Sequence, residues 1–519
     1  MKKVIPLLLT ALLLTGCASA PEAAVETTVP VQTTAMTEAA AETAPVAATD
    51  ASVYTSRFDS ETVITLSDDG LTVNGGGETD TVYTSHDIVY YEEKTAYESG
   101  NPYGAGSETD MHTAEEAQAH TVVNITAPGA YRLSGKLSAG QIRIDLGEDA
   151  ASDPDAVVEL ILDGADITCT VAPAILFRNV YECDGGWNTE TAQPTVDTAD
   201  AGANLILAEN SRSTVSGSYV AKIYKDAEGE KKLWKQDGAV YSYMSMNVYG
   251  PGALGITAEN EGLDSALHLT VNGGTVVASA NPASDAGLDS DMGSFVNGGT
   301  VIALGSTMDW AESDSNQVTM NLQFSQYQSS GSAIVVTKED GTVIFAYDPS
   351  EDEVLGENMR QYMGAVISCP AFTRGETYQL WLDGTVTGTE TGGVYTSVTA
   401  YSGGTQMQYT GTDVGMGGMG GPRPEGGMPE DSDGQRPQPG DFTPPDGDTG
   451  GQPPEKPDGD APGAPGDGTP PDGERPPLPE GETMPDRQPP EGGQNAAGEA
   501  STGFYMNDMV NAFSGITAV

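Results

Sequence analysis

One 17-residue sequence, the repeated line, occurs twice in this chain with its two copies 25 residues apart. "GLDSALHLTVNGGTVVA" at 262–278 and "GLDSDMGSFVNGGTVIA" at 287–303 are identical at 11 of 17 positions. A repeat of this length is typical of a solenoid, in which one coil cannot bury its apolar face until the next coil stacks on it. Between residues 57 and 410, short β-branched runs alternate with Gly, Asn and Asp, which indicates coils built from β-strands.

Stacked coils predict which side chains lie above one another. Asn272 should lie over Asn297 and form a hydrogen-bonded stack, while the Gly-Gly pair that follows each Asn should turn a corner. The predicted inward pairs are Leu263/Leu288, Val271/Val296 and Val276/Val301. Matching leucines in "VELILDG" at 158–164 and "ANLILAE" at 203–209 are 45 residues apart, which suggests two coils. We therefore predict an all-β protein whose main part, residues 57–310, is a right-handed parallel β-helix.

The repeated line also places acidic side chains above one another. Asp264 and Asp289 occupy the same position, so their Cα atoms should lie about 5 Å apart. Neighbouring carboxylates repel, yet residues 236–337 contain no Lys or Arg. Calcium binds six to eight oxygen ligands and would relieve this repulsion. The predicted calcium ligands are Glu261, Asp264, Asp285, Asp289 and Asp291. The alternative is that these aspartates cap turns and face water.

Aromatic residues near the acidic coils are candidates for stacking on sugar rings. They are Tyr241, Tyr243, Tyr249 and Trp310, and packing inside the protein is the alternative for each. His268 alternates with two leucines, which predicts a side chain on the outer face of a strand.

The two ends of the chain differ from the middle. Residues 1–17 have the build of a secretory signal ending in Leu-Thr-Gly-Cys, which predicts a lipid anchor at Cys17 and a place on the outer face of a cell membrane. Residues 18–56 are predicted to be a flexible stalk and residues 412–502 a disordered acidic Pro/Gly-rich segment.

Two more regions near the C-terminus are predicted to fold together. Residues 311–411 are predicted to form a small antiparallel β-domain that caps the solenoid, because "KEDG" between two β-runs indicates a hairpin. Residues 503–519 would add a strand to that domain. Of the remaining cysteines, Cys169 and Cys183 either form a disulfide or stay as buried thiols.

The net charge of the chain limits the classes of partner that it can bind. It has 22 Lys and Arg against 76 Asp and Glu, a net charge of −54. Nucleic acids and anionic lipids are bound through basic patches, so neither is an expected partner of the folded part. A neutral polymer fits, and so does an anionic polymer bridged by metal ions.

Several ordered motifs together resemble a known family. "GAYRLSGKLSAGQIRIDLG" at 129–147, "VVELILDGADIT" at 157–168, "DGAVYSYMSMNVYGPGALGITA" at 237–258 and the two repeated lines are similar to the clostridial family of exported β-helix proteins that bind cellulose and acidic pectic polymers. The resemblance implies a fold like that of pectate lyases, with calcium on the helix. Tyr241 stands where the later coils have Asp, which leaves the number of calcium sites open.

The resemblance and the residues predict a non-catalytic, calcium-dependent polysaccharide-binding protein. A polysaccharide lyase is the first alternative, and it would need a base from Lys231, Lys232 or Lys235. A hydrolase would need two carboxylates around a water, which Asp264 and Asp289 or Asp291 would have to supply. The third alternative is a structural surface or adhesion protein without a sugar ligand.

Overall fold

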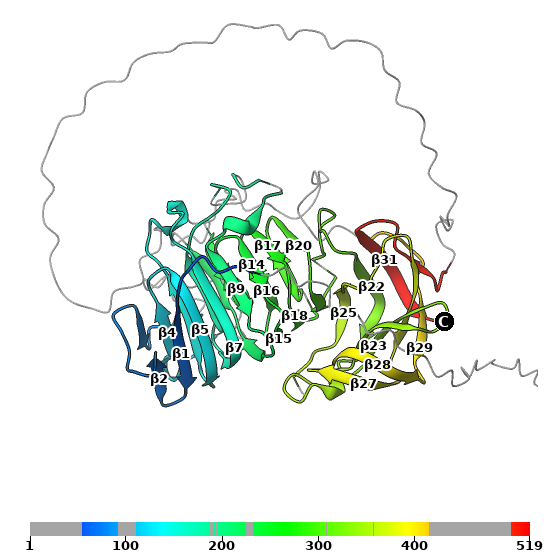
Figure 1. The fold of residues 1–519 in the computed structure, drawn as a ribbon, viewed down its shortest axis with the longest axis horizontal. Coiled ribbons are helices and arrows are strands. Elements are labelled where there is room, and N and C mark those ends of the chain that lie inside the picture. The colour runs from blue at the N-terminus through cyan, green and yellow to red at the C-terminus, as the bar shows by residue number, and fades with distance from the viewer. Residues whose placement is uncertain are drawn as a thin grey trace, which may run out of the picture. The chain divides into compact units, whose positions relative to one another are not determined.

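The computed structural model is built almost entirely from β-strands (Figure 1). It describes residues 54–91, 111–186, 191–193, 195–224, 232–283, 285–307, 309–356, 358–414 and 500–519. Cys17, most of the predicted stalk and most of the predicted Pro/Gly-rich segment lie outside these residues. Within them the one α-helix is α1 (Ala114–Gln118), which a capping box at Thr113 starts. No helix in the described ranges has the length and apolar character needed to cross a membrane.

Parallel strands stack coil by coil in a first series. After β1 (Glu61–Ser67) come β5 (Gly129–Leu137), β7 (Val158–Thr168), β9 (Ala203–Leu207) with β10 (Arg212–Gly217), β14 (Met246–Tyr249) with β15 (Ala253–Ala258), β17 (His268–Val271) with β18 (Thr275–Ser279), and β20 (Gly293–Val296) with β21 (Thr300–Gly305). β2 (Gly70–Val73) forms an antiparallel hairpin with β1. Figure 1 shows β5, β7 and β9 side by side.

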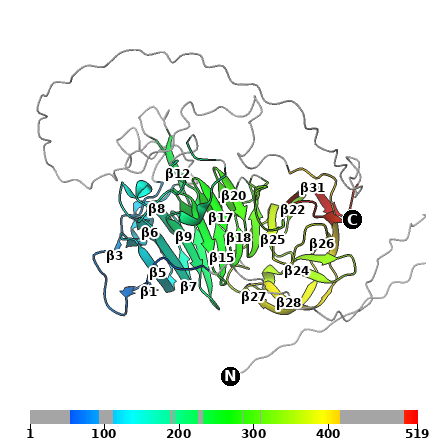
Figure 2. The same cartoon turned by 45° about the horizontal axis from the view of Figure 1, so that its top comes forward.

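A second parallel series runs through the same coils. Its strands are β4 (Thr121–Ile125), β6 (Gly140–Asp145), β8 (Ile175–Asn179), β13 (Gly238–Ser242), β16 (Glu261–Ser265) and β19 (Leu288–Ser290). β3 (Val82–Ser85) pairs with β4 in the antiparallel sense at its start. Figure 2 shows β3, β6 and β8 of this series.

The pairing confirms the predicted stacking of the repeated line. Leu263 pairs with Leu288, Val271 with Val296 and Val276 with Val301, and all six side chains belong to one buried core. The predicted glycine corner is also present: Gly274 and Gly299 have φ of 85° and 83°, and a Cβ on Gly299 would lie 2.4 Å from the Gly274 carbonyl. The right-handed closure of the coils stays a prediction.

One predicted spacing was wrong. The leucines of 158–164 and 203–209 are not two coils apart, because Leu160 pairs directly with Leu205 and Leu162 with Leu207. The 45 residues make a single step, since the chain leaves the stack at Tyr181 and returns to it at Gly202, whose amide donates to the Tyr181 carbonyl; these two residues bound the 181–202 insertion. A second excursion forms the antiparallel hairpin of β11 (Val220–Tyr224) and β12 (Lys232–Gln236).

The C-terminal strands form a mainly antiparallel sheet with its own core. They are β22 (Thr319–Gln328), β23 (Ile334–Lys338), β24 (Val343–Tyr347), β25 (Tyr362–Ser368), β26 (Thr377–Leu382), β27 (Thr385–Thr391), β28 (Val394–Ser402), β29 (Thr405–Gln408), β30 (Phe504–Tyr505) and β31 (Val510–Ala518). β23 and β24 form the hairpin around the "KEDG" turn. β31 runs parallel to β22 and antiparallel to β29, while β25 pairs with β21 in the antiparallel sense.

Cys169, Cys183 and Cys369 are free thiols. Cys169 and Cys369 are buried among apolar side chains, and this burial raises the pKa of each thiol to about 12. The disulfide between Cys169 and Cys183 that the sequence allowed is not formed.

Candidate functional site

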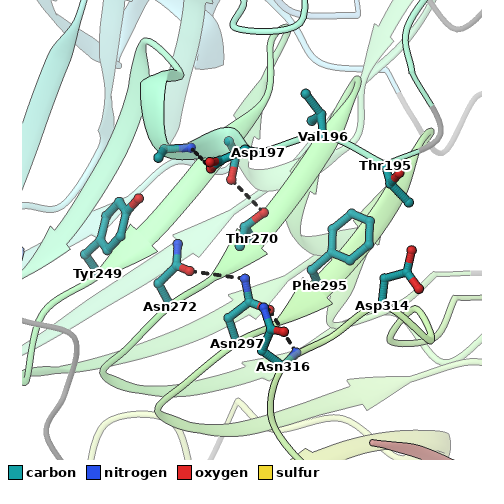
Figure 3. Close-up of a pocket in the computed structure, with 12 residues that line it drawn as sticks. Thr195, Val196, Asp197, Tyr249, Thr270, Asn272, Phe295, Asn297, Asp314 and Asn316 are labelled. Atoms are coloured by element: carbon teal, nitrogen blue, oxygen red, sulfur yellow. Dashed lines mark hydrogen bonds between the residues drawn. The ribbon is translucent and has the colours of Figure 1, made fainter.

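A column of asparagine side chains runs along the first series of strands (Figure 3). Each amide donates to the amide oxygen of a neighbour: Asn247 Nδ2 to Asn204 Oδ1 at 3.1 Å, Asn272 to Asn247 at 3.3 Å, Asn297 to Asn272 at 3.3 Å and Asn316 to Asn297 at 3.1 Å. The stack predicted for Asn272 and Asn297 is therefore confirmed. An amide carries both donors and acceptors, so identical neighbours satisfy one another.

The first part of this asparagine column is covered by the 181–202 insertion. Asn204 and Asn247 are buried, and the 3₁₀ turn Thr198–Asp200 lies over them. Asn247 Nδ2 donates to the Thr198 carbonyl at 2.6 Å, and the Thr198 hydroxyl lies 2.7 Å from Asn247 Oδ1 and 2.9 Å from Thr270 Oγ1. These contacts fix the turn as a wall beside the remaining asparagines.

Beyond the turn the column opens into a groove of about 480 Å³. Its floor carries the amides of Asn272, Asn297 and Asn316. The other lining side chains include two aromatic rings, the insertion wall and two carboxylates: Tyr249, Phe295, Thr195, Val196, Thr198, Thr270, Asp197 and Asp314. Figure 3 shows that these residues come from neighbouring coils and from the insertion. The groove is thus a polar, aromatic-flanked channel without a basic side chain in its lining.

The N-terminal segment 54–58 closes the far end of the same column. Glu159 pairs in register with Asn204 and is fully buried. Its carboxylate accepts hydrogen bonds from the Tyr54 hydroxyl at 2.8 Å, the Ser56 hydroxyl at 2.5 Å and the Arg57 amide at 2.7 Å. The Tyr54 ring lies against Tyr249, with centroids 4.6 Å apart. Tyr249 is therefore held in place at the edge of the groove.

Carboxylates gather on the second series of strands. Asp264 on β16 pairs in register with Asp289 on β19, as predicted. Asp237, Glu261 and Asp264 each offer an oxygen within 4.8 Å of the others. Glu261 is 5% exposed, and its Oε2 is buried without a hydrogen-bond partner. A buried carboxylate oxygen with no partner indicates a missing positive group.

The mutual repulsion of these groups shows in their pKa values. Burial first, then the carboxylates of Asp289 and Asp264, raise the pKa of Glu261 well above its ordinary value. Burial and the neighbouring Asp289, which shares a hydrogen bond with it, raise the pKa of Asp309 to about 8. Glu261 and Asp309 therefore resist ionisation at neutral pH.

One lysine reaches the acidic cluster from the β11–β12 hairpin. Lys235 Nζ contacts Asp237, and its charge lowers the pKa of both Glu261 and Asp309. The coils themselves supply no cation, but this hairpin does. Among the described residues that one ammonium group faces six carboxyl groups, those of Asp237, Glu261, Asp264, Asp285, Asp289 and Asp309.

The structure gathers most of the predicted calcium ligands and adds two. Asp285 and Asp289 are close enough to Glu261 to raise its pKa. Asp291 was predicted to share the face of Asp289, but β19 ends at Ser290, so the alternation stops before it. Asp237 and Asp309 were missed, because both lie outside the repeated line.

Two of the four predicted sugar-stacking residues are inside the protein, which corrects the prediction for them, while Tyr249 lines the groove. Tyr241 is 1% exposed and packs against Leu176, and Trp310 is 7% exposed within the main core. Neither ring has a face free for a sugar. Tyr243 is half-buried with its ring edge-on to Tyr241 at 5.0 Å. His268, predicted to point outward, is fully buried.

Comparison with known proteins finds matches to part of the chain. Residues 119–341 match the family model described as carbohydrate-binding domain-containing protein. A protein of that description from Acetivibrio thermocellus is 26% identical over 159 residues, which cover 30% of this chain and 45% of the relative. The match thus spans less than half of that protein.

A solved structure also shows a partial likeness. It is described as the polysaccharide lyase-like protein from C. thermocellum, in a gadolinium derivative, and is 18% identical with a TM-score of 0.28. The match covers 46% of this chain and 68% of that one, and at this TM-score it carries no argument about the fold. The asparagine column and the acidic cluster both lie within the region 119–341, which matches the carbohydrate-binding domain family.

Proposed function

We propose that this protein binds a neutral polysaccharide, such as cellulose, in the groove above Asn272, Asn297 and Asn316. The observation that carries the proposal is the open end of the asparagine column next to Tyr249. Amides donate to and accept from sugar hydroxyls, while aromatic rings supply apolar contact area. Amides repeated about 4.8 Å apart along the stack suit a ligand that is itself a repeating chain.

The charge of the groove favours a neutral glycan over a uronate polymer. The ionisable side chains in its lining are Asp197 and Asp314, both exposed, and they would repel a polymer of carboxylates. An acidic pectic glycan remains the alternative, and it would need bridging metal ions.

We further propose calcium as the countercharge of the acidic cluster. The donors fit, because carboxylate oxygens are the ligands that calcium prefers and the buried Glu261 Oε2 lacks a partner. Asp237, Glu261 and Asp264 would hold the ion, with Asp289 one coil further on. Bound calcium would supply positive charge that lets these carboxylates ionise next to one another, and so it would stabilise the stacking of the coils.

The proposed binding is non-catalytic. A uronate lyase would need a nitrogen base free to take a proton. Of the three candidate lysines, Lys231 and Lys232 have side chains outside the described residues, and Lys235 has its Nζ in contact with Asp237. The proposal also includes the right-handed closure of the coils as a β-helix, export of the chain and a lipid anchor at Cys17, all of which rest on the sequence.

Pull-down of the full chain on insoluble cellulose and on polygalacturonate tests the function. We expect retention on cellulose, with Tyr249→Ala weakening the affinity about tenfold because an aromatic contact is lost. The matched control is Tyr327→Ala, an exposed tyrosine away from the groove, which should bind like the wild type. Equal loss in both variants, or release of unsaturated uronate detected by absorbance, would count against the proposal.

A further inference from the structure

We propose that Glu182, Asp184 and His268 form a second metal site, distinct from the acidic cluster, for a borderline divalent cation such as Zn²⁺. Each of the three offers a ligand atom within 4.8 Å of the others. Glu182 and His268 are buried, so the donors face one another inside the protein rather than solvent.

The site lies where the 181–202 insertion meets the stack. His268 begins β17, Ser245 precedes β14 one coil earlier, and Gly293 pairs with His268 one coil later. The ring of Phe295 stacks beside the imidazole, with the two ring centroids 6.3 Å apart. Glu182 and Asp184 come from the start of the insertion, so the cluster joins the insertion to the coils.

The hydrogen bonds of the cluster leave it one positive group short. His268 Nε2 lies 2.7 Å from the Gln193 carbonyl, which only accepts, so this nitrogen carries the proton. The neutral ring then presents its lone pair at Nδ1. The Ser245 hydroxyl lies 3.2 Å from that Nδ1 and 2.9 Å from Glu182 Oε1. Its single proton cannot serve both acceptors, so one of them needs a further proton or a cation.

The donor set selects the class of metal. An imidazole nitrogen with two carboxylates suits zinc and its neighbours, whereas calcium takes oxygen ligands. The supporting contacts are those of a metal-binding histidine, because the Gln193 carbonyl fixes the ring through Nε2. Asp184 is oriented in turn by the backbone amides of Gly186 and Gln193, and Glu182 by the Ser245 amide at 2.7 Å.

A metal here would also act on the groove. The insertion that carries Glu182 and Asp184 continues to Thr195 and Asp197, which line the groove. Tying its start to His268 would hold that wall against the open amides. This consequence rests on the proposed function, but metal binding at the site does not.

Calorimetric titration of the chelator-treated full chain with ZnCl₂, in excess calcium to fill the acidic cluster, tests the site. We expect one zinc per chain, with Asp184→Asn weakening zinc binding at least tenfold. Asp264→Asn is the matched control, since it alters the acidic cluster and should leave zinc binding unchanged.

His268→Gln removes the nitrogen donor and should also abolish zinc binding, with circular dichroism to confirm the fold. If the His268→Gln variant does not fold, the Asp184→Asn variant, which changes a less buried residue, still tests the proposed zinc site. No zinc binding in excess calcium, or zinc binding that both folded variants keep, would overturn the proposal. Zinc binding without any change in retention on cellulose would overturn only the link to the groove.

Discussion

The same coils carry two polar columns that differ in how they are satisfied. On one series of strands Asn272 and Asn297 stack and hydrogen bond at 3.3 Å. On the other, Asp264 and Asp289 stack in the same register. An amide offers donors and acceptors, whereas an ionised carboxylate only accepts. Repetition of one residue therefore stabilises the first column and strains the second.

Because of this difference, the stability of the acidic side of the coil should depend on the cations and the pH of the solution, whereas the stability of the amide side should not. In the asparagine column, each amide from Asn204 to Asn316 forms a hydrogen bond with a neighbouring amide. The acidic cluster leaves Glu261 Oε2 without a partner and raises the pKa of Asp309 to about 8. Cations and protons should therefore stabilise the acidic side and leave the amide side unaffected.

The largest expected effect comes from making the amide column acidic. Asn247→Asp replaces a buried amide that donates to the Thr198 carbonyl and to Asn204 Oδ1 with a charge that faces two acceptors. We expect a loss of about 3–5 kcal/mol in the free energy of unfolding, measured with urea. Asn316→Asp, at the exposed end of the column, is the control and should cost less than about 0.5 kcal/mol. Equal losses of unfolding free energy in the two variants would contradict the proposed difference between the buried and the exposed end of the asparagine column.

Calcium should have the next largest effect, and only through the acidic side. At a concentration 100-fold above its Kd, a single calcium ion would stabilise the fold by about 2.7 kcal/mol. Thermal melts with calcium and with chelator measure this shift. Asp264→Asn should lose the response, while Asp314→Asn, an exposed acid at the groove, should keep it. A melting temperature that is insensitive to chelator would dismiss a stabilising ion.

The pH dependence of stability should follow Asp309. Its folded pKa of about 8 lies above the ordinary 3.8, so above 3.8 the folded chain holds a proton that the unfolded chain has lost. This contribution is complete below 3.8 and disappears as the pH rises through about 8, on the order of 1 kcal/mol per pH unit. Urea unfolding across this range without calcium measures the slope. Asp309→Asn should reduce this slope, with Glu261 accounting for part of what remains, and an unchanged slope would contradict the assignment.

The smallest expected effect is the loss of one half-exposed amide. Asn297→Ala removes hydrogen bonds to Asn272 and Asn316 where water can replace them. We expect a cost of about 1 kcal/mol in unfolding free energy, together with weaker retention on cellulose. A loss as large as that of Asn247→Asp would show that burial does not separate the two ends of the column.

The sequence predicted what the repeat itself contains. The pairs Leu263/Leu288 and Asp264/Asp289 and the stack of Asn272 on Asn297 follow from a 25-residue period, because each coil places equivalent residues in register. Burial within a coil was harder to predict. His268 was assigned to the surface from local alternation, and Tyr241 was a candidate for sugar stacking because it lies near the acidic coils, but both are buried.

The parts missed by sequence reasoning come from outside the period. Asp237 and Asp309 join the acidic cluster from segments before and after the repeated lines, whereas Lys235, which reaches it from a hairpin, was among the lysines that the sequence offered as candidates. The insertion at 181–202 forms the groove wall and accounts for the single step from Leu160 to Leu205. No spacing in the sequence says where a long excursion returns, since its packing depends on contacts far along the chain.

The covering of the first asparagines has a consequence for binding strength. The Thr198 turn leaves three amides open, those of Asn272, Asn297 and Asn316. One molecule of the protein would therefore contact only a few sugar rings of a long polymer. A contact this short releases easily. If many copies of the protein bind the same fibre, those that dissociate can rebind while others remain bound. Avidity, rather than the affinity of a single site, would then govern attachment.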